Sequence, residues 1–211
     1  MGARGKKLQA TVFTIGHSTR TIAELIELLR AHKVRRVVDV RSIPRSRHNP
    51  QFNRETLARR LRAARIGYLH LKKLGGLRRA KADSKNLGWH NASFRGFADY
   101  MQTNEFLVGL ERLQKLAVTR PTAIMCAEAV PWRCHRSLIA DALVVRDFPV
   151  KDIMTASREQ EHKLTPFARV RGLRITYPTD KPAKRGGAVR EDRPDPRLRR
   201  GRQEAKAPAS A

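Results

Sequence analysis

The sequence predicts an α/β fold, a single domain with a mostly parallel, Rossmann-like or flavodoxin-like sheet flanked by helices. Short apolar runs with strand character alternate along the chain with segments whose apolar residues recur at helical spacing. That alternation is typical of strand–helix–strand units, whose strands run parallel. A length of 211 residues and a hydrophobic content of 40% suit one core with a tail.

The first half of the chain begins with a strand predicted over residues 11–15, which stops at Gly16. A helix follows to about His32, because Thr21 and Glu24 form a capping box. The apolar residues behind that box are spaced i, i+3, i+4 and i+7, namely Ile22, Leu25, Ile26 and Leu29. The second strand is predicted over residues 34–40, which contain four valines.

A loop with two prolines, residues 42–52, leads to the next helix. Asn53 can cap this helix, whose apolar face holds Leu57, Leu61 and Ala64. A short third strand is predicted over residues 67–71. The apolar residues of the segment 78–94 recur at neither helical nor strand spacing, and the segment mixes Lys and Arg with Gly, Trp and His. We therefore expect them to form a loop that covers a substrate or a locally disordered segment.

Two helices are predicted next, over residues 97–103 and 105–117. The fourth strand, residues 122–125, ends at Cys126. Cys134 opens a helix whose apolar face holds Leu138, Ile139, Ala142 and Leu143. The fifth strand is expected over residues 148–154, and residues 173–177 are expected to form a sixth at the sheet edge.

Composition sets the expected boundaries of the domain. Residues 1–10 are expected to form a flexible basic leader, and residues 11–178 are expected to form the α/β domain. Residues 179–211 are rich in Pro, Gly, Ala, Lys and Arg with almost no large apolar side chain. Such a segment cannot bury a core, so we expect a disordered basic tail.

Charge and cysteine content narrow the class of protein. The net charge is +26, and the segment 179–211 holds only 10 of the 45 basic residues, so the domain itself attracts polyanions. A nucleic acid or a nucleotide phosphate is therefore the expected partner. With no apolar run of about 18 residues and no secretory signal, no membrane association is expected. Two cysteines make no disulfide framework, which favours a cytoplasmic protein with reduced thiols.

Polar residues follow four of the predicted strands at their carboxyl ends. They are His17 and Ser18 after the first strand, Asp39 and Arg41 at the second, Tyr68 and His70 at the third, and Cys126 and Glu128 at the fourth. Parallel sheets bind ligands in the crevice beyond this edge. We therefore predict a site there, with the segment 125–136 at its centre.

The chemistry expected of this site depends on its two thiols. Arg133, Arg136 and a helix N-terminus favour a thiolate. The pair can act as nucleophile and partner, as a redox pair or as two metal ligands, or Cys126 can be a small buried apolar residue. A phosphatase loop needs Cys, five residues and Arg, whereas Arg133 comes one residue too late. Two cysteines with seven residues between them do not match structural zinc sites, and His17 or His70 would have to complete the shell.

The candidate residues divide into two groups. The expected catalytic residues are Cys126, Cys134, Glu128, His17, Asp39 and His135. The expected substrate-binding residues are Ser18, Arg41, Arg47, His70, Gly75, Gly76 and Arg136. Asp39 can also be a structural acid paired with Arg41 or His17, and Trp89 can stack on a base or pack its own loop. No cofactor is expected, and His32, His48 and His162 are expected at the surface, outside the site.

Several motifs in order resemble one family. They are Thr14-Ile15-Gly16-His17-Ser18, Val38-Asp39-Val40-Arg41, Leu74-Gly75-Gly76, Cys126-Ala127-Glu128 and Cys134-His135-Arg136. The chain is similar, over residues 11–178, to the family catalogued as domain of unknown function 488. The resemblance implies no activity, since the family is named for having none established. Members often carry Val-x-His-Ile on the fifth strand, where this chain has Asp152 in place of the histidine.

Three functions are compatible with these features. The first is a Cys-centred enzyme that acts on an anionic substrate, a nucleotide or a nucleic acid, at the carboxyl edge of the sheet. The second is a non-catalytic nucleic-acid-binding module that uses a basic face and the tail. The third is a metal-binding protein.

Overall fold

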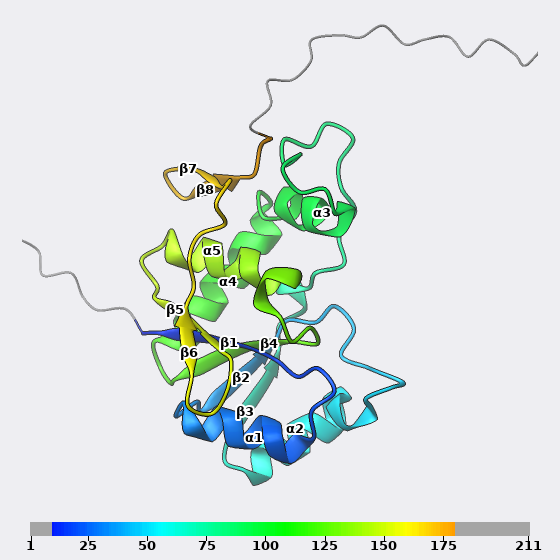
Figure 1. Ribbon diagram of the computed structural model, residues 1–211, viewed down its shortest axis with the longest axis vertical. Coiled ribbons are helices and arrows are strands. Elements are labelled where there is room, and N and C mark those ends of the chain that lie inside the picture. Colours follow the sequence, from blue (N-terminus) through cyan, green and yellow to red (C-terminus); the bar gives the residue numbers. More distant parts are fainter. Residues whose placement is uncertain (1–9, 180–211) are drawn as a thin grey trace, which may run out of the picture. The chain divides into compact units, whose positions relative to one another are not determined.

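The structure, a computed structural model, describes residues 10–179. All but one residue of the predicted leader (1–10) and all but one residue of the predicted tail (179–211) lie outside the described residues. Within the described part, a six-stranded sheet has the order β3-β2-β4-β1-β5-β6 (Figure 1). Strands β1 to β5 pair in parallel, and β6 pairs with β5 in antiparallel fashion. The prediction of an α/β fold with a mostly parallel sheet is thus confirmed.

The strands of this sheet are β1 (Val12–Gly16), β2 (Arg36–Asp39), β3 (Gly67–His70), β4 (Thr122–Cys126), β5 (Val150–Ile153) and β6 (Glu159–Glu161). The helices are α1 (Ile22–Ala31), α2 (Arg54–Ala63), α3 (Ala92–Tyr100), α4 (Asn104–Ala117) and α5 (Arg136–Val144). Three 3-10 turns are η1 (Pro50–Phe52), η2 (Lys72–Leu74) and η3 (Pro131–Arg133). In the part of the chain that the structure describes, the longest helix has 14 residues, and none is long and apolar enough to cross a bilayer.

Helices cover both faces of the sheet (Figure 1). Alternate residues of β4 point to opposite faces. Ala123 and Met125 pack in the cluster that holds the apolar residues of α1 and α2, whereas Ile124 and Cys126 belong to the cluster of α3, α4 and α5. Cys126 therefore lies on the same face as α5, whose first turn follows Cys134.

Local capping explains where two helices begin. The predicted box at Thr21 is present, with the Thr21 and Glu24 side chains each bonded to the other's backbone. Helix α3 begins at Ala92, earlier than the predicted 97, because the Asn91 side chain accepts the backbone N–H of Ser93.

The predicted sixth strand of the sheet is wrong. Residues 173–177 contain β8 (Arg174–Thr176), which pairs with β7 (Arg169–Arg171) in a separate hairpin. The sheet ends next to β5 with β6 instead, whose sequence Glu-Gln-Glu carries no apolar signal. Ile175 and Tyr177 are buried against the α3–α5 layer, which accounts for the apolar pattern that indicated a sheet strand.

Most of the segment 78–94 is an ordered loop that is held in place by hydrogen bonds and aromatic contacts. It is neither a cover over the site nor disordered. The buried carboxylate of Asp99 accepts hydrogen bonds from the Lys81 backbone and from the side chains of Ser84 and Asn86. Trp89 packs against Phe94, Phe167 and Tyr177 and so secures the loop.

Gly16 is required where β1 meets the segment after β4. A Cβ atom at Gly16 would lie 1.8 Å from the Glu128 carbonyl oxygen and 2.8 Å from the Ala129 Cα atom. Both are backbone atoms, so the overlap cannot be relieved by a side-chain rotation. We predict that Gly16→Ala lowers the free energy of unfolding by about 3 kcal/mol, measured by urea denaturation. Gly67→Ala is the matched control, because its nearest contact is an ordinary 3.6 Å; an equal loss in both variants would contradict the prediction.

Candidate functional site

A cleft of about 580 Å³ lies at the carboxyl ends of β1, β2 and β4. The predicted site residues that line it are His17, Ser18, Arg41, Gly76, Cys126, Glu128 and His135. The predicted residues outside its lining are Asp39, Arg47, His70, Gly75, Cys134 and Arg136. The structure therefore brings residues from separate strand ends into one cavity, as expected of a parallel sheet.

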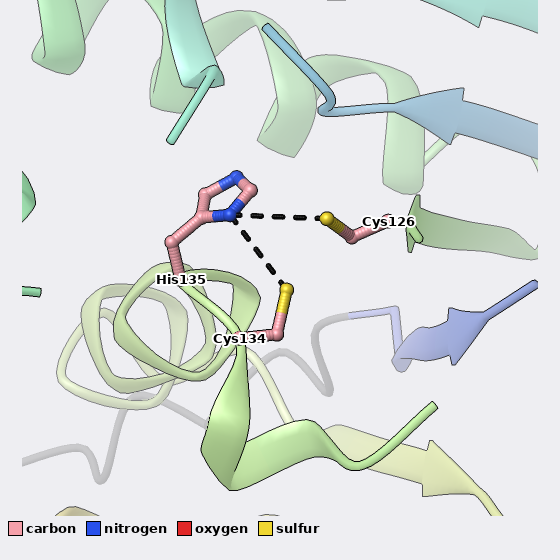
Figure 2. Close-up of side chains that lie close together, drawn as sticks. All are labelled: Cys126, Cys134 and His135. Atoms are coloured by element: carbon pink, nitrogen blue, oxygen red, sulfur yellow. Dashed lines mark hydrogen bonds between the residues drawn. The ribbon is translucent and has the colours of Figure 1, made fainter. Parts of the chain in front are cut away.

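Two thiols and one imidazole lie close together (Figure 2), and two of these three residues, Cys126 and His135, line the cleft. The Nδ1 atom of His135 lies 3.9 Å from Sγ of Cys126 and 3.7 Å from Sγ of Cys134. Cys126 is the last residue of β4, Cys134 follows η3, and His135 is the N-cap residue of α5. Both cysteines are free and largely buried, but Cys126, which is 9% exposed, reaches the cleft lining.

The orientation of the His135 ring is set by the backbone. Its Nε2 atom lies 3.0 Å from the carbonyl oxygen of Val40 and 3.1 Å from that of Leu74. Two carbonyl acceptors at Nε2 require a proton there, which leaves the lone pair of Nδ1 directed at the sulfur atoms in the neutral ring. The edge-on ring of Phe97 and the absence of a side chain at Gly76 complete the slot.

The two thiols differ in acidity because one donates to the other. A hydrogen bond from the Cys134 S–H lowers the pKa of Cys126 well below its usual value, and His135 and Arg136 add to this against the effect of burial. The same hydrogen bond, together with burial, raises the pKa of Cys134. Cys126 is therefore the more acidic thiol of the pair.

Arg136 is enclosed beneath the segment between the cysteines. Its guanidinium donates to the carbonyl oxygens of Glu128 and Ala129, and its Nε donates to Thr14. These hydrogen bonds hold the segment in place, and the side chain is only 1% exposed. Its buried positive charge also lowers the pKa of Cys126.

Asp39 and Arg41 form a buried ion pair behind the cleft. Nη2 of Arg41 lies 2.6 Å from the Asp39 carboxylate, which also accepts a hydrogen bond from the Tyr68 hydroxyl. Nη1 of Arg41 lies 3.2 Å from Nε2 of His17, whose Nδ1 lies 2.9 Å from the Ser18 carbonyl oxygen. Burial lowers the pKa of His17, which favours a neutral ring that accepts from Arg41. Asp39 thus has the structural partners that the alternative interpretation named.

The remaining predicted residues differ in their access to the cleft. Glu128 lines it, and its carboxylate accepts the backbone N–H of Val130. Nε2 of His70 lies 2.8 Å from the carbonyl oxygen of Arg41, behind the cleft. Gly75 packs on Ser42, where a Cβ atom would lie 2.7 Å from the hydroxyl oxygen. Arg47 is exposed.

Five polar residues that line the cleft were not among the predicted site residues, namely Thr19, Ser42, Arg45, Ser46 and Asn49. Thr19 follows β1, whereas the other four lie in the loop after β2, where their order along the chain has no period. The sequence signal that could have found them is their position directly after a strand end, which had already selected Arg41.

The expectation that His162 lies at the surface is wrong. Its Nε2 atom is 2.9 Å from the Asp141 carboxylate and its Nδ1 atom is 3.5 Å from that of Asp152. Asp152 in turn accepts from Thr14, which also contacts Arg136. Asp152, at the position where the resemblance implies a histidine, is thus a carboxylate that pairs with a histidine from elsewhere in the chain. His32 is likewise largely buried, with Nδ1 3.2 Å from Glu159.

His162 makes stability depend on pH. Burial alone lowers the pKa of His162, but Asp141 and Asp152 raise it from 6.5 to about 9. Protonated His162 therefore stabilises the fold by up to about 3 kcal/mol. This contribution is complete below about pH 6.5 and is lost as the pH rises through about 9. Urea denaturation across this window should show the loss, and His162→Gln should flatten it. An unchanged slope in the variant would assign the pH dependence to other groups.

Comparison with known proteins gives one match. No curated protein and no solved structure matches the chain. A family model matches residues 21–143, a segment that contains Asp39, Arg41, both cysteines and His135. Because the match spans more than half of the 211 residues, the chain belongs to the family described as Domain of unknown function DUF488.

Proposed function

We propose that the cleft is the active site of a thiol-dependent enzyme that acts on an anionic substrate, a nucleotide or a nucleic acid. The observation that carries this proposal is the setting of Cys126. Cys126 lines an open cleft, and its sulfur lies within 4.8 Å of a second thiol and 3.9 Å from an imidazole nitrogen. A nucleophilic cysteine needs a stabilised thiolate and a nearby group that exchanges protons.

The residues divide the work as follows. Cys126 attacks the electrophilic atom of the substrate, and Cys134 stabilises the thiolate before the attack. His135 takes the proton of the Cys126 thiol at Nδ1 and gives it to the leaving group as the bond to that group breaks, since its Nε2 proton is held by backbone carbonyls. Water then attacks the group bound to Cys126, and Glu128, the carboxylate in the cleft lining, accepts the proton of that water as the bond to sulfur breaks and the thiolate is regenerated.

The anionic substrate is inferred from the charge of the cleft and of the whole chain. Arg45 lines the cleft, its side chain is exposed, and among the described residues no carboxylate forms an ion pair with it. The buried guanidinium of Arg41 also reaches the lining, although Asp39 balances its charge. A guanidinium without a carboxylate partner suits phosphate, and the net charge of +26 favours polyanions.

The charge of the cleft can be tested with two alkylating probes of similar size. Anionic iodoacetate should modify Cys126 faster, relative to neutral iodoacetamide, at low salt than at high salt. Arg45→Ala should reduce this preference, and Arg47→Ala is the matched control, because Arg47 is exposed but lies outside the lining. Equal effects of the two variants would place the charge outside the cleft.

Catalysis is tested by incubating the full-length protein with nucleoside mono-, di- and triphosphates and with short RNA and DNA strands. We expect turnover of at least one of them by the wild type and none by Cys126→Ser. Turnover that persists in Cys126→Ser would overturn the proposal. The proposal would also be overturned if none of these compounds is turned over and none of them protects Cys126 from alkylation.

The charge of +26 also favours a second candidate, a non-catalytic nucleic-acid-binding module. This function requires salt-sensitive binding of RNA or DNA that Cys126→Ser leaves unchanged. Binding that weakens in Arg45→Ala and is accompanied by turnover would favour the enzyme instead.

A further inference from the structure

We propose that Cys126, Cys134 and His135 form a binding site for a soft divalent metal ion, Zn²⁺ above all, and that the bound ion masks the thiol of Cys126. The binding site is inferred from the geometry alone. The masking rests on the proposed function, because it concerns the reactivity that this function assigns to Cys126.

The three side chains present the donor atoms of a Cys₂His set. Both sulfur atoms and Nδ1 lie within 4.8 Å of one another. Tetrahedral zinc with ordinary bond lengths needs sulfur–nitrogen separations of about 3.5 Å. The sulfur–nitrogen separations here are 3.7 and 3.9 Å, so shifts of a few tenths of an ångström bring them to that value. The two sulfur atoms lie at most 4.8 Å apart and must come to about 3.8 Å when both bind one zinc ion. Thiolate and imidazole ligands favour zinc over magnesium or calcium.

The outer contacts of His135 are those of a metal ligand. Ligating histidines commonly donate their second ring N–H to a carbonyl or carboxylate, which fixes the tautomer and the ring plane. Nε2 of His135 has two such carbonyl acceptors, and Nδ1 faces the thiols (Figure 2). Gly76 lies against the ring, where a Cβ atom would be 2.4 Å from Nδ1, so the backbone holds the imidazole in place.

The site is built from rigid elements and is open on one side. One sulfur belongs to the last residue of β4, and the imidazole belongs to the N-cap residue of α5. Cys126 and His135 both line the cleft, so a fourth coordination position faces it. Three protein ligands and one water are typical of accessible zinc sites.

Binding changes protonation but not oxidation state. Zn²⁺ takes the place of the proton on Cys134 and of any proton on Cys126, and these protons pass to the buffer. The ion keeps one water molecule at the position facing the cleft. A sulfur lone pair that is shared with Zn²⁺ is less available for attack, so the metal-loaded protein should be unreactive at Cys126 until a chelator removes the ion.

The test uses full-length protein, reduced and freed of metal, to which Zn²⁺ alone is added. We expect one Zn²⁺ per chain at this site by calorimetry, and affinity weakened by about 100-fold or more in Cys134→Ser and in His135→Asn. His90→Asn is the control, because His90 is exposed and distant in sequence from the trio. Zinc should slow alkylation of Cys126 at least about tenfold, and chelator should restore it.

Cobalt provides a measurement on the wild type, which does not depend on variants that fail to fold. Co²⁺ at this site should show thiolate-to-metal charge-transfer absorption and the strong visible bands of a tetrahedral ion. Absence of these bands, or zinc binding that Cys134→Ser leaves unchanged, would overturn the inference. The proposed enzymatic function would still hold in that case if the metal-free protein showed turnover that depends on Cys126. Conversely, zinc binding without any turnover by the metal-free protein would contradict only the proposed function.

Discussion

In metal-free protein at about pH 6, Cys126 should react with iodoacetamide roughly tenfold faster than an unperturbed thiol, while Cys134 stays unmodified. The cause is the hydrogen bond from the Cys134 S–H, which lowers the pKa of Cys126 and raises that of Cys134. Thiolate is then present at a pH where a free cysteine is almost entirely protonated. The expected gain is smaller than the gain in thiolate, because a thiolate of lower pKa is a weaker nucleophile. Mass spectrometry of the two peptides across a pH series measures both rates.

Cys134→Ala separates this explanation from simple exposure. It removes the donor, which a serine hydroxyl would keep, and should slow the reaction of Cys126 at about pH 6 by roughly tenfold. The same variant enlarges access to Cys126, so an exposure effect would instead speed the reaction. Equal rates for the two cysteines in the wild type would contradict the assignment of Cys126 as the thiolate.

The location of the cleft could be predicted from sequence because it depends on local signals. Apolar runs identify the strands, parallel pairing follows from the alternation with helices, and the residues after each strand must then share one edge. Cys126 and His17 were found in this way. Their order across the sheet was not accessible, since β4 lies between β2 and β1 through contacts about a hundred residues apart in the chain.

The partners of the buried charged groups could not be predicted from the sequence, for a related reason. The pairing of His162 with Asp141 and Asp152 requires that β5, β6 and α5 be placed together first. A lone histidine between Glu161 and Lys163 carries the pattern of a surface residue. The role of His135 as the partner of both thiols likewise depends on the carbonyls of Val40 and Leu74, which orient its ring.

Asp39→Ala should lower the free energy of unfolding by about 3 to 5 kcal/mol. The Asp39 carboxylate is fully buried and accepts hydrogen bonds from the Arg41 backbone, the Arg41 guanidinium and the Tyr68 hydroxyl. Its removal leaves a buried guanidinium without its counter-charge, which costs more than the hydrogen bonds alone. Urea denaturation at neutral pH measures the loss.

A double variant shows whether the uncompensated charge is the cause. In Asp39→Ala/Arg41→Met both charges are gone, so the protein should be more stable than Asp39→Ala alone by about 1 kcal/mol or more. The recovery cannot be complete, because the guanidinium also donates to the Phe52 carbonyl oxygen and contacts His17. Losses that simply add, to within about 0.5 kcal/mol, would mean that the two side chains act independently. Asp39 would then stabilise the edge of the cleft through its hydrogen bonds rather than through its charge.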